Sequence, residues 1–157
     1  MVAVRASYVG SKVLATAIRD IQSKTLRVGW FETARYQDGT PVAYVAAIQE
    51  FGHGAIPPRP FMRPTIEAQR QAWRDTLRKG AKQVLAERLT FEQMLTAFGL
   101  SAAGQVAESI KAVTAPPLSP RTLAARQAKK KTPGVSTKPL IDTALMFQSV
   151  TAQVSDE

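Results

Sequence analysis

The sequence predicts an α+β fold, with a small antiparallel sheet packed against two long helices and a long, basic, Pro-rich arm before a C-terminal helix and strand. Two long segments in the middle of the chain carry apolar residues at helical spacing, which predicts the helices. Short stretches near both ends have the composition or the alternation of strands. The length of 157 residues suits one hydrophobic core, so we expect a single domain over residues 1–157.

The N-terminal part predicts one helix and one strand. Residues 11–22 carry apolar side chains at helical spacing. Residues 25–32 are rich in strand-forming residues, and Leu26, Val28 and Trp30 fall on one face. This strand would form part of the expected sheet.

A shorter helix is predicted over residues 42–51. Pro41 suits the start of a helix, and Gly52 stands just past its end, where glycine is favoured. The prolines of residues 54–64 remove backbone donors and fix φ, which excludes a regular helix. We expect a stiff, extended connector there, with Phe61 as its apolar anchor.

Two long helices are predicted next, over residues 63–89 and 91–113. Thr90 and Gln93 match the capping box that begins many helices. Helical spacing predicts that these residues form the buried face of the first helix: Ile66, Trp73, Leu77, Ala81, Val84 and Leu85. The corresponding face of the second helix consists of Phe91, Leu95, Phe98, Ala102, Val106 and Ile110.

The composition of residues 114–139 shifts to Pro, Ser, Thr, Lys and Arg, which predicts an extended loop or arm. Its length exceeds the roughly 12–15 residues of ordinary structureless connections, and such loops are normally functional or disordered. Asp142 or Thr143 is then placed to cap a short helix. The alternation over residues 150–154 predicts a terminal strand.

The chain is strongly basic, with 21 Lys and Arg against 12 Asp and Glu and a formal net charge of +9. Such an excess suggests an anionic partner, which would be nucleic acid, an anionic membrane or an acidic protein surface, and solubility alone is the alternative explanation. Cations recur every four residues along the first long helix, and we call this set the basic stripe: Arg70, Arg74, Arg78 and Lys82. The arm adds Lys129, Lys130 and Lys131. We expect both groups to face DNA or an acidic partner; for the stripe, a solvated charged face is the alternative.

No catalytic or metal site is recognisable. The sequence lacks cysteine, and His53 is its single histidine, so a Ser-His-Asp triad would depend on it and a zinc site would lack further His or Cys ligands. Three acids lie near aromatic residues, Glu32, Asp38 and Glu50, but no spacing marks them as paired glycosidase carboxylates. We expect no enzymatic activity, metal, cofactor or small-molecule substrate. No stretch reaches the roughly 18 apolar residues of a membrane span, so we expect no membrane partner.

Two segments resemble one known family. The first is residues 43–64 (AYVAAIQEFGHGAIPPRPFMRP), and the second is residues 117–154, which runs from PLSPRTLAARQAKKK to STKPLIDTALMFQSVTAQV. In this order they resemble the neck and tail-completion (head-tail joining) proteins of long-tailed bacteriophages and Mu-like prophages. The family's second segment usually reads Leu-Ile-Asp-Thr-Gly, whereas here Ala144 follows Thr143. Because alanine disfavours positive φ, we expect the turn to continue directly into a helix.

The resemblance implies a virion structural protein that forms a ring, commonly of six subunits, and completes the tail or joins it to the head. Its partners would be other copies of itself, the connector or adaptor, the tail terminator or tail tube, and packaged DNA in the channel. It would reside in the virion neck or tail, and in the host cytoplasm during assembly. We expect the subunit interface to involve Phe51, Ile56, Pro58, Arg59, Pro60, Phe61, Pro117, Leu118, Arg121, Leu140, Ile141, Asp142 and Thr143.

Other interpretations stay open. A tail terminator or connector adaptor of the same virion region would have a similar sequence, and a non-specific basic nucleic-acid-binding protein would have a similar charge. A phage peptidoglycan hydrolase would need Glu32 or Glu50 as an essential acid. Plain core packing is the alternative role for four of the apolar interface residues, which are Phe51, Phe61, Leu140 and Ile141.

Overall fold

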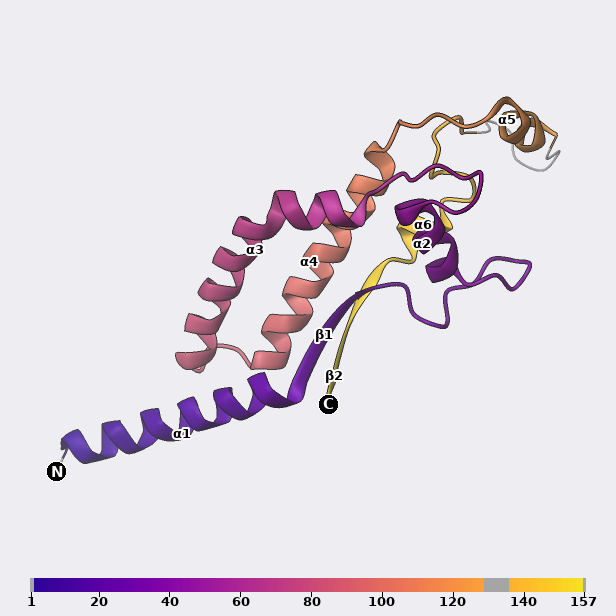
Figure 1. Cartoon of the computed structure of the whole chain (residues 1–157). Coiled ribbons are helices and arrows are strands. Elements are labelled where there is room, and N and C mark those ends of the chain that lie inside the picture. Colours follow the sequence, from indigo (N-terminus) through magenta and orange to yellow (C-terminus); the bar gives the residue numbers. More distant parts are fainter. Residues whose placement is uncertain (1, 129–135, 157) are drawn as a thin grey trace. The chain divides into compact units, whose positions relative to one another are not determined.

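The computed structural model describes residues 2–128 and 136–156, and for residues 2–11 the backbone alone (Figure 1). Over these residues the fold is α+β, with six helices and a small two-stranded antiparallel sheet, as the sequence predicts. The chain divides into two compact units. Unit 1 comprises residues 1–28, 69–102 and 152–157, and unit 2 comprises residues 29–68 and 103–151.

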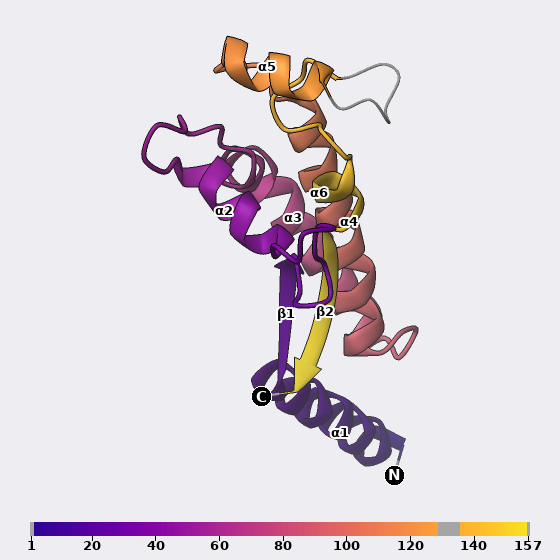
Figure 2. The same cartoon turned by 90° about the vertical axis from the view of Figure 1, so that its right-hand side faces the viewer.

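The sheet joins the two ends of the chain. Helix α1 (Val2–Ser23) leads into β1 (Lys24–Gly29), which pairs with β2 (Thr151–Asp156), and the two strands lie side by side in Figures 1 and 2. The prediction of a helix over residues 11–22 is confirmed, although α1 begins earlier. The predicted strand over residues 25–32 is also confirmed, although it ends sooner, at Gly29.

The sheet of unit 1 packs closely on a helix. A Cβ added at Gly99 would lie 2.7 Å from Leu26 Cδ1 on β1 and 2.7 Å from Ala152 Cβ on β2. A Cβ at Gly80 would likewise meet Met94, 2.6 Å from its Cγ. These two glycines therefore allow neighbouring elements to approach more closely than any larger residue would.

The two long helices are α3 (Met62–Leu85) and α4 (Phe91–Ala112), close to the predicted bounds. The capping box is confirmed, because the Gln93 N–H donates to Thr90 Oγ1 at 3.1 Å and the Thr90 N–H donates to Gln93 Oε1 at 2.9 Å. None of the helices in the described part of the chain is long and apolar enough to span a membrane.

The predicted buried faces are correct for α4 and wrong in part for α3. On α4 the buried residues include four of the predicted six, which are Leu95, Ala102, Val106 and Ile110. On α3, Ile66 and Leu85 remain 40% and 49% exposed. Between Ile66 and Leu85, α3 contacts α4 at two places. The Trp73 ring lies edge-on to the Phe98 ring, with their centres 5.9 Å apart, and Gly80 lies against Met94.

Unit 2 is built around α2 (Val42–Phe51), which has the predicted bounds. Pro41 precedes it with φ −63°, and Gly52 ends it with a positive φ of 79°. The core of unit 2 consists of Val42, Ala46, Phe61, Val106, Ile110, Leu140 and Met146. Trp30 covers this core, with its ring edge-on to Phe61 at 5.8 Å and its Nε1 donating to the Met146 carbonyl at 2.7 Å.

The predicted arm contains a helix. Helix α5 (Pro120–Gln127) lies within residues 114–139, so the described part of this segment is not wholly extended. The Ser119 side chain accepts from the Thr122 N–H at 3.2 Å, and Pro120 occupies the first turn. Serine followed by proline is a helix-start signal, which the basic, Pro-rich composition of the segment obscured.

The turn before α6 (Leu145–Gln148) differs from the prediction. Ala144 adopts a left-handed conformation with φ 64°, so the turn does not continue directly into the helix. The chain reverses there despite the roughly 1–2 kcal/mol that this conformation costs a non-glycine residue. Neither Asp142 nor Thr143 is the N-cap; the Thr143 hydroxyl accepts from the Leu145 N–H at 3.4 Å.

Candidate functional site

The two segments that carry the family resemblance meet in unit 2. The first, residues 43–64, provides α2 and the Pro-rich connector, and nearly all of the second, residues 117–154, provides α5, α6 and the loops around them. Three buried charged side chains organise these segments, namely Glu50, Arg59 and Arg126. Each binds backbone groups that are distant in sequence.

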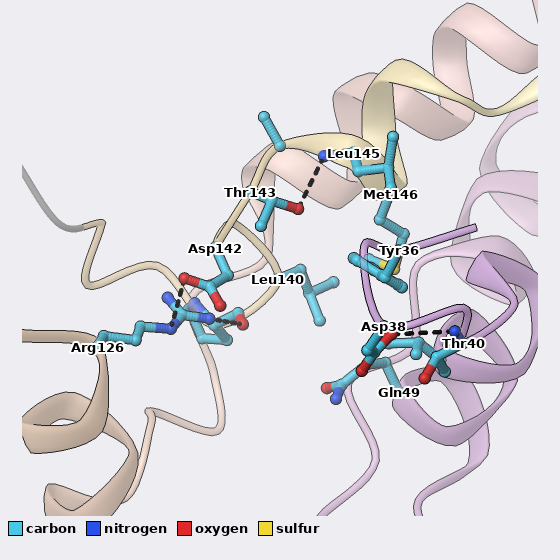
Figure 3. A pocket seen from close by; sticks show the side chains of 13 residues that line it. Tyr36, Asp38, Thr40, Gln49, Arg126, Leu140, Asp142, Thr143, Leu145 and Met146 are labelled. Carbon is cyan, nitrogen blue, oxygen red and sulfur yellow. Dashed lines mark hydrogen bonds and ion pairs between the residues drawn. The ribbon is translucent and has the colours of Figure 1, made fainter. Parts of the chain in front are cut away.

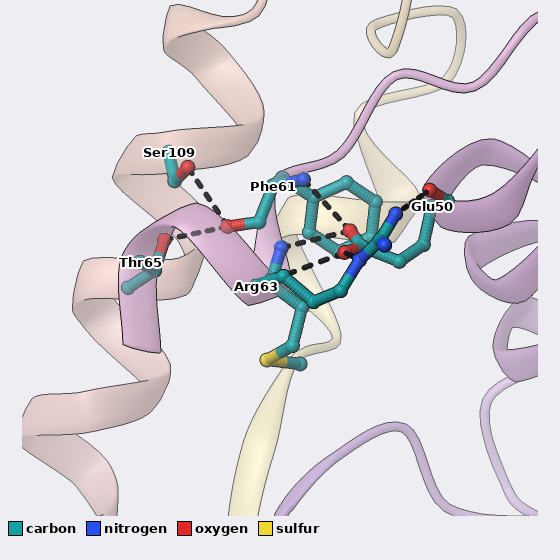
Figure 4. A network of polar contacts seen from close by, with 6 residues as sticks. Glu50, Phe61, Arg63, Thr65 and Ser109 are labelled. Carbon is teal, nitrogen blue, oxygen red and sulfur yellow. Dashed lines mark hydrogen bonds and ion pairs between the residues drawn. The ribbon is translucent and has the colours of Figure 1, made fainter. Parts of the chain in front are cut away.

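Glu50, in the last turn of α2, caps the beginning of α3 (Figure 4). Its Oε2 accepts from the N–H groups of Phe61 at 2.7 Å and Met62 at 2.9 Å. Its Oε1 accepts from the Arg63 N–H at 3.1 Å and from Arg63 Nε at 2.9 Å. We call this arrangement the Glu50 clamp. A carboxylate is favourable there because the first N–H groups of a helix lack intrahelical partners.

Burial alone would raise the pKa of Glu50, but the hydrogen bonds from Phe61, Met62 and Arg63 outweigh burial and lower it. The carboxylate is therefore ionised at neutral pH. A general acid of a glycosidase needs the opposite, a pKa raised toward neutrality.

The carbonyl of Phe61 extends the same network to α4. It accepts from Thr65 Oγ1 at 2.6 Å and from Ser109 Oγ at 3.1 Å (Figure 4). The Phe61 ring is 1% exposed in the core. Ring, N–H and carbonyl together fix the end of the Pro-rich connector against two helices.

Arg59 joins the first segment to the start of the second. Its guanidinium donates to the carbonyls of Pro116 at 2.7 Å and Pro117 at 3.0 Å, and to Gln49 Oε1 at 3.2 Å. The side chain is 5% exposed. Burial lowers the pKa of Arg59, and the positive charge of Arg126 lowers it further. Two buried cations thus share this part of unit 2, and both are bonded mainly to carbonyl oxygens.

Arg126 holds the loop that returns from α5 to the core. The residue is 7% exposed, and its Nε lies 3.7 Å from Asp142 Oδ1 (Figure 3). Its Nη atoms donate at 2.8–3.1 Å to the carbonyls of Ser136, Lys138, Pro139 and Ile141. The side chain therefore binds several backbone carbonyls of residues 136–141, a segment without regular structure.

A polar pocket lies beside Arg126, between residues of both segments (Figure 3). Tyr36, Asp38 and Gln49 line one side, and Leu140 and Asp142 line the other. Burial raises the pKa of Tyr36, with a further contribution from the negative charges of Asp142 and Asp38. No group of three or more His, Cys, Asp and Glu residues suited to a metal occurs among the described residues.

The predicted interface residues fall into three groups by burial. Arg59, Phe61 and Leu140 are buried within the chain itself, so Phe61 and Leu140 pack in the core, as the alternative interpretation held. Leu118 and Ile141 are half-buried. The others are exposed: Phe51, Ile56, Pro58, Pro60, Pro117, Arg121, Asp142 and Thr143.

Two of the exposed side chains form what we call the apolar tip of unit 2, Phe51 and Ile56, which are 65% and 40% exposed. The Arg63 guanidinium lies 4.9 Å from the centre of the Phe51 ring. Ile56 is fixed by two backbone hydrogen bonds with His53, at 2.9 and 3.0 Å. The Phe51 ring is thus in contact with a neighbouring side chain, and the backbone that carries Ile56 is held by hydrogen bonds.

The predicted basic stripe lies on α3 within unit 1, and all four of its residues are exposed. Arg78 pairs with Asp75 at 3.1 Å. The arm cations Lys129, Lys130 and Lys131 lie outside the described residues.

Sequence reasoning missed the roles of Glu50 and Arg126. An acid in the last turn of a helix opposes the helix dipole, so the position of Glu50 was a signal that it serves another element. Arg126 gave no local signal, because its carbonyl partners follow it by 10 to 15 residues in an irregular loop.

No family model, curated protein or solved structure matches this chain. The family resemblance therefore depends on the sequences of the two segments alone.

Proposed function

We propose that this chain is a structural protein of a long-tailed bacteriophage, which forms a ring at the neck of the virion and completes the tail or joins it to the head. Its role is to assemble, not to catalyse a reaction. The alternative role in the same virion region is that of a tail terminator or connector adaptor, which would differ from the proposed role in its neighbours.

One observation carries the proposal: the two family-like segments are bonded to each other in one compact unit. Arg59 of the first segment donates to the carbonyl of Pro117, the first residue of the second, and the two segments share a core through Phe61 and Met146. A fold shared with the family requires the two segments to lie together, and these contacts meet that requirement.

The apolar tip supports an assembly role. A ring requires a heterologous contact between two different surfaces of the subunit, repeated until it closes. Exposed apolar side chains on a stiff backbone suit such a contact, because little conformational entropy is lost when they are buried by a neighbour. Phe51 and Ile56 meet both conditions.

The first test is the mass of the purified protein in solution by light scattering, alone and with phage tails that lack their neck. We expect ring-sized oligomers in at least one of the two conditions. A strict monomer that also ignores the tails would overturn the proposal.

A surface variant then tests the interface. The double substitution Phe51→Ser and Ile56→Ser should leave the circular dichroism spectrum unchanged, since both side chains are exposed, and should abolish the oligomer. The matched control is Leu100→Ser, which changes a 55% exposed side chain of unit 1. Deleting residues 116–138 is a poorer test, because it removes Arg126 and the carbonyl partners of Arg59 and so disturbs the fold.

A further inference from the structure

The strongest charged surface outside the segments discussed above is the basic stripe on α3. Successive members are four residues apart, so they lie about 6 Å apart along the helix and the stripe spans about 18 Å. Each step advances the position by about 40° around the axis, which makes the stripe wind slowly. Like charges at this spacing destabilise an isolated helix. Such a cost suggests an anionic partner.

The acids beside the stripe neutralise part of its charge. Asp75 accepts from Arg78 at 3.1 Å and from Gln71 at 3.3 Å. This pair is exposed, with 70% of the Arg78 side chain accessible, so Arg78 can still reach a partner. Exposed ion pairs of this kind are weak and do not hold the arginine in place.

The residues around the stripe favour a polyanion over a protein partner. Protein interfaces have cores rich in aromatic and apolar side chains. The large exposed apolar residues of α3 among those described are Ile66 and Leu85, which lie beyond the two ends of the stripe. The one aromatic residue between them, Trp73, is half-buried against Phe98.

The packing of Trp73 also favours double-stranded over single-stranded nucleic acid as the partner. Binding of single strands depends on exposed aromatic side chains on which bases stack. Trp73 is not available for stacking because it packs on Phe98. Arginine forks and lysine ammonium groups suit phosphate oxygens, and contacts to phosphates carry no base information.

We propose that the basic stripe binds the phosphate backbone of double-stranded DNA through charge, without reading the base sequence. This inference does not depend on ring formation, and it concerns unit 1, whereas the proposed interface lies in unit 2.

The test measures binding of a fluorescent duplex of mixed sequence over a series of salt concentrations, with the full-length protein. The variant carries Arg74→Gln and Lys82→Gln, two exposed positions, so the fold should be retained. If both cations contact phosphates, the slope of log K against log salt should become shallower by about 2. The affinity should fall for every duplex sequence alike.

The matched control carries Arg19→Gln and Arg27→Gln, which remove two exposed cations of unit 1 that are not on α3. It should keep a slope within experimental error of the unmodified protein. An equal loss in the control would attribute binding to net charge and overturn the proposal, as would a protein that binds no duplex at low salt.

A competition experiment separates DNA from an acidic protein. Unlabelled duplex should displace the labelled duplex, and polyglutamate at the same charge concentration should displace it poorly. Equal displacement by polyglutamate would contradict the proposal and assign the stripe to an acidic protein surface.

Discussion

The two compact units stabilise themselves in different ways. Unit 2 contains all four buried polar or charged residues found in the described part of the chain, which are Glu50, Arg59, Thr65 and Arg126. The buried residues of unit 1 are instead apolar: Ala17, Met94, Leu95 and Ala102. Unit 2 therefore adds hydrogen bonds between buried polar side chains and the backbone to its apolar core, whereas the buried side chains named for unit 1 contribute apolar packing alone.

The two units differ in their buried polar side chains because they differ in how much of their backbone lies in helices and strands. Unit 1 consists mainly of helices and a sheet, whose backbone groups bond to one another. Unit 2 contains the Pro-rich connector and the loop after α5, where few such bonds are possible. Buried guanidinium and carboxylate groups supply the missing partners, since buried backbone groups without partners are costly.

The largest effect is expected at the centre of the irregular loop. Arg126→Ala should lower the free energy of unfolding of unit 2 by about 3 kcal/mol, because it leaves several carbonyls without a donor. Trp30 lies in unit 2 and Trp73 in unit 1, so urea unfolding monitored by fluorescence in a Trp73→Phe background follows the surroundings of Trp30. The control Arg121→Ala, exposed on the same helix, should change stability by less than about 0.5 kcal/mol. Equal effects of the two substitutions would contradict the assigned role.

A smaller effect, with a pH signature, is expected at the Glu50 clamp. The folded-state pKa of Glu50 lies below its ordinary value of 4.5, so the clamp stabilises unit 2 fully above pH 4.5 and is lost as pH falls through the lowered pKa. Glu50→Gln should cost about 2 kcal/mol at pH 7 and should weaken the loss of stability in acid. The same fluorescence titration at pH 7 and at steps from pH 5 down to pH 3 measures both quantities.

Glu32→Gln provides the control, because Glu32 is an exposed carboxylate of the same unit. It should leave both the stability at pH 7 and its pH dependence nearly unchanged. If Glu50→Gln kept the full acid sensitivity, another carboxylate would be responsible for it.

The comparison also explains what the sequence could predict. The helices over residues 42–51 and 91–112 follow from Pro41, Gly52 and the Thr90–Gln93 box, which are local signals between neighbouring residues. The roles of Arg59 and Arg126 depend on carbonyls up to 58 residues away, and no local pattern encodes such partners.

The turn at Ala144 is a second feature that local sequence preference did not predict. Local preference favours a negative φ for alanine, yet the chain adopts 64° there. The buried residues on either side, Leu140 and Met146, must both reach the core of unit 2. Tertiary packing overrides the local preference at this position.

The smallest changes in stability are expected for two glycine-to-alanine substitutions on α4, one in each unit, and they should have opposite signs. In Gly99→Ala, on the sheet-facing side of α4, the new Cβ would lie 2.7 Å from Ala152 Cβ, which is fixed to the backbone of β2 and cannot turn aside. In Gly104→Ala, on the same helix in unit 2, nothing lies within 4 Å of the new Cβ. Alanine gains up to about 1 kcal/mol over glycine in any helix interior, whereas overpacking costs about 1–3 kcal/mol. Gly104→Ala should therefore stabilise the protein, and Gly99→Ala should destabilise it. Hydrogen exchange of the α4 amides measures both effects. If both substitutions stabilised the protein, the sheet would not pack closely on α4.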